Sequence, residues 1–225
     1  MIFRLDQHDY TFPDPTLAEQ DGLLAVGGDL SAPRLLMAYA QGIFPWYSED
    51  TPILWYAPPL RFVLRPDHIK VSKSMRKVMS SDLFQISYNK AFQQVIHHCA
   101  SIERKDQDGT WIVQDMLNAY IHLHELGFAH SIEVWHNHQL VGGLYGVLVG
   151  RVFCGESMFS RMSNASKAAL IYLSTHFDLE LIDCQIHSDH LQSLGAEHIN
   201  CSVFYNLLQD QQYAKHGLDV LFRNS

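Results

Sequence analysis

The stretch Ser131–Ser160, SIEVWHNHQLVGGLYGVLVGRVFCGESMFS, decides the fold of this chain. Ser131–Trp135 alternates between apolar and polar residues, which is typical of a strand with one buried face. Leu140–Val149 and Val152–Phe159 are apolar and rich in β-branched and aromatic residues, and both are predicted as strands. The residues HNHQ at 136–139 form a plausible turn between the first two strands. Strands joined by such short connections pair antiparallel, so an antiparallel meander is predicted.

Helical spacing appears on both sides of this meander. The further predicted elements are helices at 92–99 (capped by Asn89), 112–126 and 164–177, a strand at 180–186 and a short helix at 191–198. Strands clustered between helices, with a hairpin at their centre, indicate an α+β fold. We therefore expect a mostly antiparallel central sheet rather than a doubly wound parallel sheet.

The first 60 residues have a different character, because they are rich in proline, glycine and aromatic residues. One short helix fits there: Ser31 can cap it, the apolar stripe runs to Ala40, and Gly42 can end it. Pro58-Pro59 is the best boundary candidate. We expect a small irregular N-terminal domain at residues 1–60 and a larger domain at residues 61–225.

Composition limits the class of protein. The chain has 225 residues, of which 47% are hydrophobic, and this is enough for one sizeable core or for a domain with a smaller appendage. The four cysteines lack CxxC spacing and are predicted to be reduced thiols of a cytosolic protein. The N-terminus does not have the pattern of a secretory signal, and no apolar run reaches the roughly 18 residues of a membrane span. We expect a soluble, cytoplasmic protein.

The net charge of −8 conceals one basic segment. Residues 61–77 contain six basic residues against a single acid, whereas the chain on either side is acidic. These basic residues are Arg61, Arg65, Lys70, Lys73, Arg76 and Lys77. Such a segment in an acidic protein is typical of phosphate contacts, and the alternative is a solvated basic face.

Two acids lie inside apolar segments that are predicted as strands. Glu156 lies within GESMFS, and Asp183 precedes Gln185 in IDCQ. Burying a carboxylate is costly unless a partner compensates it, so this set predicts a site that handles a cation or a proton. The alternative is a structural ion pair of these acids with Arg161 or Lys167.

Other motifs favour structural roles. The glycine-rich run 142–146 lies within a predicted strand and opens no helix, so it indicates a bulge or a close approach, either by the chain itself or by a ligand. The histidines include no HExxH and no zinc-finger spacing, so we expect no metal site. Ser157 and Ser160 lack a nucleophile elbow, and Cys154 and Cys184 lie in apolar strands, so covalent catalysis is not expected.

Several long segments resemble the bacterial leucyl/phenylalanyl-tRNA–protein transferases. They are DGLLAVGGDL at 21–30, GIFPW at 42–46, PILW at 52–55, GTWI at 109–112, LHELG at 123–127, HSIEVW at 130–135, GESMFSR at 155–161, NASK at 164–167, LIDCQ at 181–185 and SLGA at 193–196. The resemblance runs in chain order from about residue 3 to residue 199. It implies a small N-terminal domain and a C-terminal domain similar to the acyltransferases that use acetyl-CoA.

The resemblance also implies an activity and its partners. Members of this family move leucine or phenylalanine (and methionine) from an aminoacyl-tRNA to a protein whose N-terminal residue is arginine or lysine. The product carries an N-degron that marks it for degradation. Because an aminoacyl ester is already activated, its aminolysis requires neither ATP nor a metal, and no cofactor is expected. We expect a monomer, because no exposed apolar helix is evident.

The same resemblance assigns roles to residues. Asp183 is expected to orient or deprotonate the incoming amine, or to act as an electrostatic anchor while a ribose hydroxyl relays the proton. Gln185 is expected to hydrogen-bond the tetrahedral centre or the amine, and Glu156 to hold the cationic acceptor terminus. Lys73, Arg76 and Lys77 match the place where the acceptor stem would bind. The residues that match the apolar pocket for the donor side chain are Trp46, Trp111, Leu144, Phe153, Met158, Ser160, Leu170, Leu173, Phe177 and Ile182.

The chain departs from the family pattern in three places. The link from Phe177 to Leu181 is short and lacks the usual glycine, Asn200-Cys201 stands where the family commonly has Pro-Arg, and the tail after Asn206 does not match. Two other functions are alternatives. An acetyl-CoA-dependent N-acetyltransferase would show a Q/RxxGxG/A loop before a helix, which is not found in the sequence. A non-catalytic module that binds tRNA or a protein N-terminus would not need the three polar residues Glu156, Asp183 and Gln185.

Overall fold

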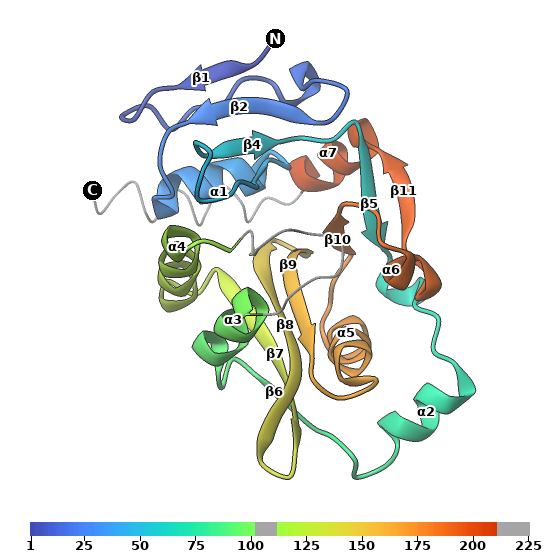
Figure 1. Cartoon of the computed structure of the whole chain (residues 1–225). Coiled ribbons are helices and arrows are strands. Elements are labelled where there is room, and N and C mark those ends of the chain that lie inside the picture. Colours follow the sequence, from blue (N-terminus) through green and yellow to red (C-terminus); the bar gives the residue numbers. More distant parts are fainter. Residues whose placement is uncertain (102–111, 211–225) are drawn as a thin grey trace.

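The computed structural model describes residues 1–101 and 112–210. Figure 1 shows two stacked parts, a small sheet near the N-terminus and a larger sheet with helices below it. The division between the two sheets falls between β4 (Leu54–Tyr56) and β5 (Leu60–Leu64). The mostly antiparallel α+β fold that was predicted from the sequence is confirmed.

The small sheet has the strand order β1-β2-β4-β3. Its other strands are β1 (Phe3–Leu5), β2 (Leu23–Gly27) and β3 (Phe44–Pro45), and only the β1–β2 pair is parallel. A 3-10 turn at Pro15–Leu17 and the helix α1 (Ala32–Ala40) complete this part. Ser31 stands at the predicted start of α1, but its hydroxyl donates to Asp29 rather than capping the helix.

The large sheet has the order β11-β5-β10-β9-β8-β7-β6. In addition to β5, the sheet contains β6 (Gln85–Tyr88), β7 (Ala129–His136), β8 (Gln139–Val149), β9 (Val152–Ser160), β10 (Leu181–Gln185) and β11 (Glu197–Asn200). The predicted meander is β7-β8-β9, and its first turn has Asn137 and His138 at positive φ. The β9–β10 pair is parallel, because α5 (Ala165–His176) connects the two strands.

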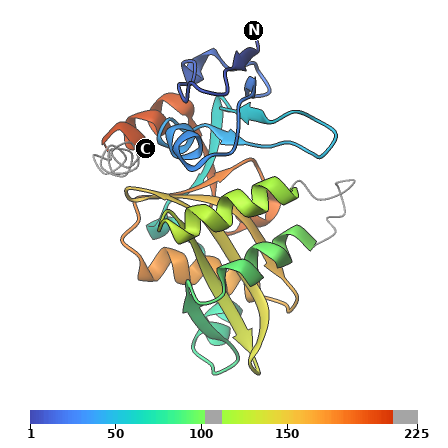
Figure 2. The ribbon, with the colours of Figure 1, turned by 90° about the vertical axis from the view of Figure 1, so that its left-hand side faces the viewer.

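Helices cover both faces of the large sheet (Figure 2). One face carries α3 (Phe92–Ser101) and α4 (Gln114–Glu125), and the other carries α5. Neighbouring residues of β8 accordingly enter different cores: Tyr145 packs with α3 and α4, and Leu144 packs with α5. The remaining helices are a 3-10 turn at Pro66–His68, α2 (Lys73–Met79), α6 (Asp189–Ser193) and α7 (Cys201–Asp210).

The glycines of β8 are required by close approaches of the chain itself. A Cβ on Gly142 would lie 2.5 Å from the Cβ of Ala165 on α5. A Cβ on Gly146 would collide with the carbonyl oxygen of Cys154, at a register shift between β8 and β9. The groups that approach are therefore parts of the protein, as the structural interpretation of this run predicted.

Besides the Ser31 cap, two further local predictions were wrong. Asn89 does not cap α3, because its side chain accepts from the amide of Ser131 and contacts His130. The helix predicted at 191–198 is instead the short α6, and Glu197–Asn200 is the edge strand β11. Gly195 separates them at φ +108, where its Cα lies close to the carbonyl of His68 and leaves no room for a Cβ.

The two parts share one hydrophobic core. The cluster that contains Leu35 and Tyr39 of α1 also contains Met116 of α4 and Phe204 of α7. Phe204 and Tyr205 lie directly against Gly42, so the last described helix packs on the small sheet's side of the molecule (Figure 1). The division into domains at 1–60 and 61–225 stays a proposal, supported by the separation of the sheets. None of the described helices has the length and apolar character required to cross a bilayer.

Candidate functional site

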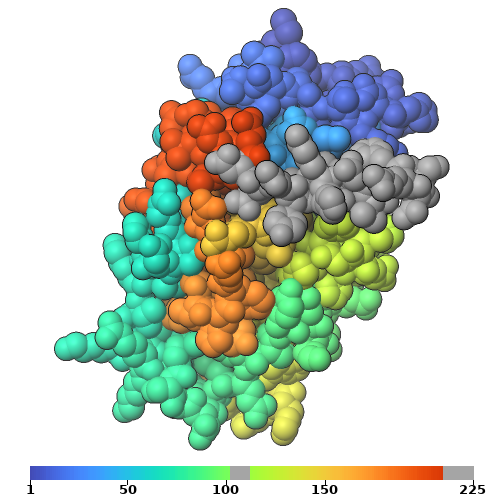
Figure 3. Space-filling view, turned by 180° about the vertical axis from the view of Figure 1, so that it is seen from behind, coloured from blue at the N-terminus to red at the C-terminus, as the bar shows by residue number. Residues whose placement is uncertain are grey.

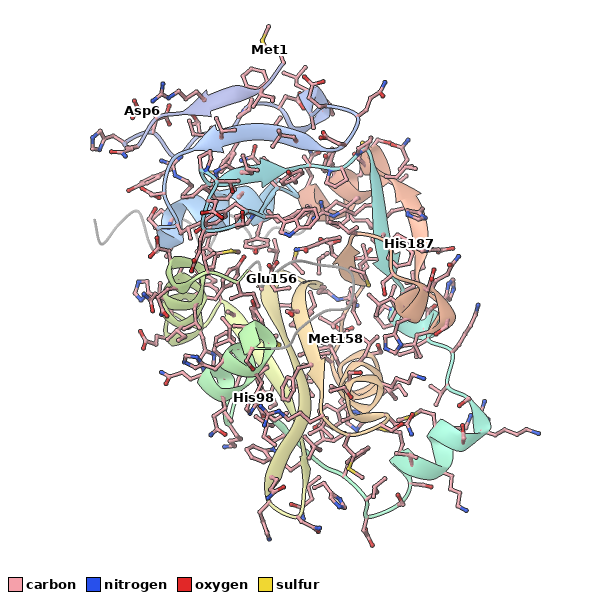
Figure 4. The ribbon with its side chains drawn as sticks, viewed as in Figure 1. Met1, Asp6, His98, Glu156, Met158 and His187 are labelled. Carbon is pink, nitrogen blue, oxygen red and sulfur yellow. The ribbon has the colours of Figure 1, made fainter. Side chains whose placement is uncertain are left out.

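A cavity of about 430 Å³ lies between the two parts of the molecule. Phe44, Pro45 and Trp46 of the small part form one wall, β9 and β10 form the floor, and α5 and α6 close the other side. In Figure 4, Glu156 lies beneath the small sheet, Met158 lies lower on β9, and His187 lies toward β5 and β11. Glu156, Asp183 and Gln185 all line this cavity, so the structure brings the three predicted polar residues together.

The carboxylate of Glu156 is held by three neutral donors. It accepts hydrogen bonds from Tyr39 Oη at 2.7 Å, Tyr120 Oη at 3.1 Å and Gln185 Nε2 at 2.7 Å. The two tyrosine hydroxyls also contact each other. Among the described residues, no cation is paired with Glu156. Burial therefore raises its pKa to about 7, although the three hydrogen bonds act in the opposite direction.

Asp183 is held quite differently, by a cation. Arg61 Nε lies 2.8 Å from Oδ1 and Arg61 Nη2 lies 2.6 Å from Oδ2, a bidentate pair in which both side chains are buried. The guanidinium also donates to the carbonyl oxygen of Gly42 at 3.0 Å and lies between the rings of Phe44 and Phe204, 4.7 Å from each centroid. The ion-pair partner of Asp183 is thus Arg61, and the alternative pairing with Arg161 or Lys167 was wrong.

Gln185 follows a bulge at the end of β10. Its φ is +61°, and the register against β5 shifts between Asp183 and Gln185. The backbone amide of Gln185 donates to Asp183 Oδ1 at 2.9 Å, while its side-chain amide reaches Glu156. A non-glycine residue in the left-handed region is strained, and the hydrogen bond to Asp183 compensates for part of that cost. Asp183 therefore determines how Gln185 is presented to the cavity.

Most of the residues predicted for the donor pocket line the apolar end of the cavity. They are Trp46, Leu144, Phe153, Met158, Leu170, Leu173 and Ile182. Ser160 does not line it, because its side chain is exposed and its hydroxyl donates to the carbonyl of Met162. Phe177 packs against Tyr88 and Tyr172 instead. Trp111 lies outside the described residues.

The basic segment 61–77 separates into buried and exposed residues. Arg61 is buried in the ion pair with Asp183, so its prediction as a phosphate contact is corrected. Arg65 is half-buried and lies 3.7 Å from Glu197. The side chains of Lys70, Lys73, Arg76 and Lys77 are exposed. Figure 3 shows this segment, in teal, along one edge of the molecule beside α5.

Sequence reasoning missed three residues of the site. Tyr39 and Tyr120 lie in segments that were predicted only as helices with an apolar stripe, and Arg61 was predicted only as one base in a basic segment. These residues come from α1, α4 and β5, which are far apart in the sequence. No spacing rule connects them.

Among the described residues, no group of three histidine, cysteine, aspartate or glutamate side chains could hold a metal ion.

Family models and individual relatives of this chain point to the same protein family. Residues 63–209 match the family model "Leucyl/phenylalanyl-tRNA protein transferase", and residues 28–59 match the model of the N-terminal domain of that family. A protein of this name from Syntrophobacter fumaroxidans is 54% identical over 93% of this chain and 90% of its own length. One from Syntrophus aciditrophicus is 57% identical over 88% of this chain and 84% of its own length.

Among solved structures, a GCN5-related N-acetyltransferase from Kribbella flavida is 10% identical, with a TM-score of 0.39 over 72% of this chain and 58% of its own length. A likeness this distant carries no functional conclusion. The matches to the family models and to the two bacterial relatives cover nearly the whole described chain. This chain therefore belongs to the leucyl/phenylalanyl-tRNA protein transferase family.

Proposed function

We propose that this chain transfers leucine or phenylalanine (and methionine) from aminoacyl-tRNA to the α-amine of proteins that begin with arginine or lysine. The observation that carries the proposal is the arrangement of Glu156 and Gln185 at the polar end of a cavity whose other end is apolar. An apolar donor side chain suits that apolar end, formed by Leu144, Phe153 and Leu170 among others. The ester bond then lies next to the hydrogen-bonded carboxylate.

The reaction makes a peptide bond from an ester. The nitrogen lone pair of the acceptor amine attacks the ester carbonyl carbon, the C–N bond forms, and the C–O bond to the ribose breaks. The amine must first lose a proton, and the ribose oxygen must gain one as it leaves. Positioning the two reactants contributes several kcal/mol to such a step, so the protein mainly has to seat them and handle one proton.

We assign the proton to Glu156. Its pKa of about 7 is close to working pH, where a general base is most effective. The negatively charged carboxylate of Glu156 attracts the cationic amine of the acceptor. Once Glu156 is protonated and neutral, this charge attraction ends. Tyr39 and Tyr120 hold the two carboxylate oxygens, which fixes the direction in which the remaining lone pairs point.

Asp183 takes the role of an anchor in this proposal. Both of its oxygens already accept hydrogen bonds from Arg61, so the carboxylate is engaged by a fixed cation of the protein rather than by the substrate amine. Its contribution is to hold the backbone of Gln185. Gln185 has a second amide N–H and a carbonyl oxygen, which suit the tetrahedral centre and the amine.

The tRNA would contact the exposed basic residues Lys70, Lys73, Arg76 and Lys77, to which we add the half-buried Arg65. Contacts of lysine and arginine with phosphates depend on salt and are largely indifferent to sequence. As a further part of the proposal, the chain acts as a monomer in the cytoplasm, and its product carries an N-degron. Aminolysis of the aminoacyl ester requires no cofactor.

The test is a transfer assay with purified chain. Radiolabelled leucine on Leu-tRNA, an acceptor that begins with arginine and no ATP should give labelled acceptor. Phe-tRNA and Met-tRNA run in parallel give the donor preference, and an acceptor that begins with glutamate is the control. Transfer no higher than without enzyme, while the charged tRNA remains intact, would refute the proposal.

A further inference from the structure

The loop that joins β10 to α6 lies at an opening of the cavity. Ile186, His187 and Ser188 line the cavity, and the first two of these residues are also exposed to solvent. A residue that both lines a cavity and reaches solvent lies where the cavity opens. A substrate group that extends out of the cavity on this side therefore passes residues 186–188.

The contacts of His187 place this opening away from the apolar end of the cavity. Its ring lies 5.0 Å from the ring of Phe62 on β5 and stacks on His198 of β11 at 5.6 Å, between ring centroids. β11 and β5 form one edge of the large sheet, whereas α5, which carries leucines of the apolar end, packs mainly on β7, β8 and β9. Figure 4 likewise shows His187 toward β5 and β11, apart from Met158. The ring of His187 is thus a supported, planar surface at the opening.

Asp189 adds a negative charge beside this ring. Its Oδ1 lies 3.8 Å from Nε2 of His187, and its side chain is 98% exposed. In the part of the chain that the structure describes, no lysine or arginine forms an ion pair with this carboxylate. Nε2 of His187 also lies 3.1 Å from Oε1 of Gln192, a contact that fixes the ring. A carboxylate next to a flat ring suits a guanidinium, which can pair with the carboxylate and stack on the ring.

The acceptor of the proposed reaction carries two positive charges on its first residue. One is the α-amine, which Glu156 attracts, and the other lies at the end of the arginine or lysine side chain. Asp183 does not suit the second charge, because both of its oxygens already accept hydrogen bonds from Arg61.

Asp189 lies within reach of the second charge. It follows Gln185, whose side chain hydrogen-bonds Glu156, by four residues, so the two backbone positions are at most about 14 Å apart. An arginine side chain, together with the side chains of Glu156 and Asp189, can bridge such a span. A phosphate of tRNA, by contrast, would be repelled by Asp189, whereas Lys73, Arg76 and Lys77 offer it positive charge on α2.

We propose that Asp189 binds the side-chain cation of the acceptor's N-terminal arginine or lysine, and that the ring of His187 lies against this group. The subsite rests on the proposed function, because it assumes an acceptor α-amine at Glu156. Asp189 selects the acceptor and takes no part in the proton transfer, which belongs to Glu156.

The test compares two acceptor peptides that differ only in one charge. One begins with arginine and the other with citrulline, the uncharged counterpart of arginine. The readout is the ratio of their kcat/KM values for transfer from Leu-tRNA, because effects on the donor or on the fold cancel in this ratio. The unaltered protein should favour the arginine peptide, and Asp189→Asn should lower the ratio about fivefold. Asp189→Lys should lower it further, since repulsion replaces attraction.

Glu125→Gln is the matched control. Glu125 is also an exposed acid beside a histidine, 3.6 Å from His122, but it lies at the end of α4 and does not line the cavity. The ratio of the two peptides should therefore stay constant in this variant. Salt gives a second readout: the ratio should fall as salt rises in the unaltered protein and depend less on salt in Asp189→Asn.

The outcomes separate the subsite from the proposed function. A ratio near one in the unaltered protein would overturn the subsite, and so would a ratio that Asp189→Asn leaves unchanged. An unchanged ratio together with a lower KM for Leu-tRNA in Asp189→Asn would instead place tRNA at this opening. If the unaltered protein transfers leucine to neither peptide while the charged tRNA stays intact, the proposed function itself fails.

Discussion

Arg61 and Asp183, on the neighbouring strands β5 and β10 of the large sheet, form a buried bidentate ion pair at the floor of the cavity. The same guanidinium binds the carbonyl of Gly42, at the end of the small part's helix α1. Asp183 in turn holds the backbone amide of Gln185. The position of Gln185, to which we assign a role in the proposed transfer, thus depends on a cation that was predicted from the sequence to contact tRNA.

Arg61→Ala should destabilise the protein by about 3–5 kcal/mol, because it leaves the carboxylate of Asp183 buried without its partner. Urea unfolding measures this loss, and transfer activity should fall with it because Gln185 loses its anchor. Arg65→Ala is the matched control: its ion pair with Glu197 is partly exposed and should contribute about 1 kcal/mol or less. Equal losses for the two variants would contradict the assigned role of Arg61.

The pKa of Glu156 makes stability depend on pH in a defined direction. Its ordinary pKa is 4.5 and the folded value is about 7, so between these values the folded state binds more protons than the unfolded state. Stability from this group is complete below pH 4.5 and is lost as pH rises through 7, by about 3 kcal/mol in all. Glu156→Gln removes this dependence.

Urea unfolding of the unaltered protein and of Glu156→Gln at pH 4.5 and pH 8.5 provides the measurement. From pH 4.5 to pH 8.5, the free energy of unfolding of Glu156→Gln should rise by about 3 kcal/mol relative to that of the unaltered protein. All other titrating groups are common to both proteins and cancel in the difference. A difference that does not change with pH would mean that Glu156 titrates near its ordinary value.

Local periodicity was sufficient to predict much of the fold. The meander of β7, β8 and β9 and the helices α4 and α5 follow from apolar spacing, because each buries one continuous stripe against the same sheet. The strand β5 was missed, since Arg61 within LRFVL suggested a basic surface. Only the buried partner Asp183, 122 positions away, makes an arginine acceptable there.

The sequence was sufficient to identify the acidic residues of the site but not the partners that set their different environments. Glu156, Asp183 and Gln185 could be selected because polar residues in apolar strands are unusual. Their different roles depend on contacts across the fold: hydroxyls of Tyr39 and Tyr120 for one acid, a guanidinium for the other. The positive φ of Gln185 arises from a bulge that no sequence pattern announced.

Tyr39→Phe and Tyr120→Phe should each shift the pH dependence of transfer. Each hydroxyl donates to the Glu156 carboxylate and thereby lowers its pKa, so its removal raises that pKa further above 7. If Glu156 accepts the proton, the rise of the transfer rate with pH should move upward by about one pH unit. The acceptor amine titrates identically with every variant, so differences report the enzyme. Tyr88→Phe, which removes a hydroxyl bonded to His130, should leave the profile unchanged.

Gly146→Ala should distort the strand that carries Glu156. The added Cβ would collide with the backbone carbonyl oxygen of Cys154 and lie 2.8 Å or less from ring atoms of Phe153, and backbone cannot move aside cheaply. We expect a loss of several kcal/mol in urea unfolding, or no folded protein. Gly155→Ala is the control, since its Cβ would meet the oxygen of Asp183 at 3.4 Å, an ordinary contact. Equal tolerance of both substitutions would contradict the register described for β8 and β9.

Leu173→Phe should change the preference among donors. Leu173 lines the apolar end of the cavity, so a larger side chain narrows the space available to the donor. One methylene in an apolar pocket is worth about 1–3 kcal/mol, and phenylalanine is the bulkier donor, so kcat/KM should fall roughly tenfold or more for Phe-tRNA relative to Leu-tRNA. Phe177→Leu changes a residue on the same side of the sheet that packs against Tyr88 and Tyr172 outside the cavity, and the ratio should stay constant. If Phe177→Leu altered the ratio and Leu173→Phe did not, the donor side chain would lie elsewhere than in this cavity.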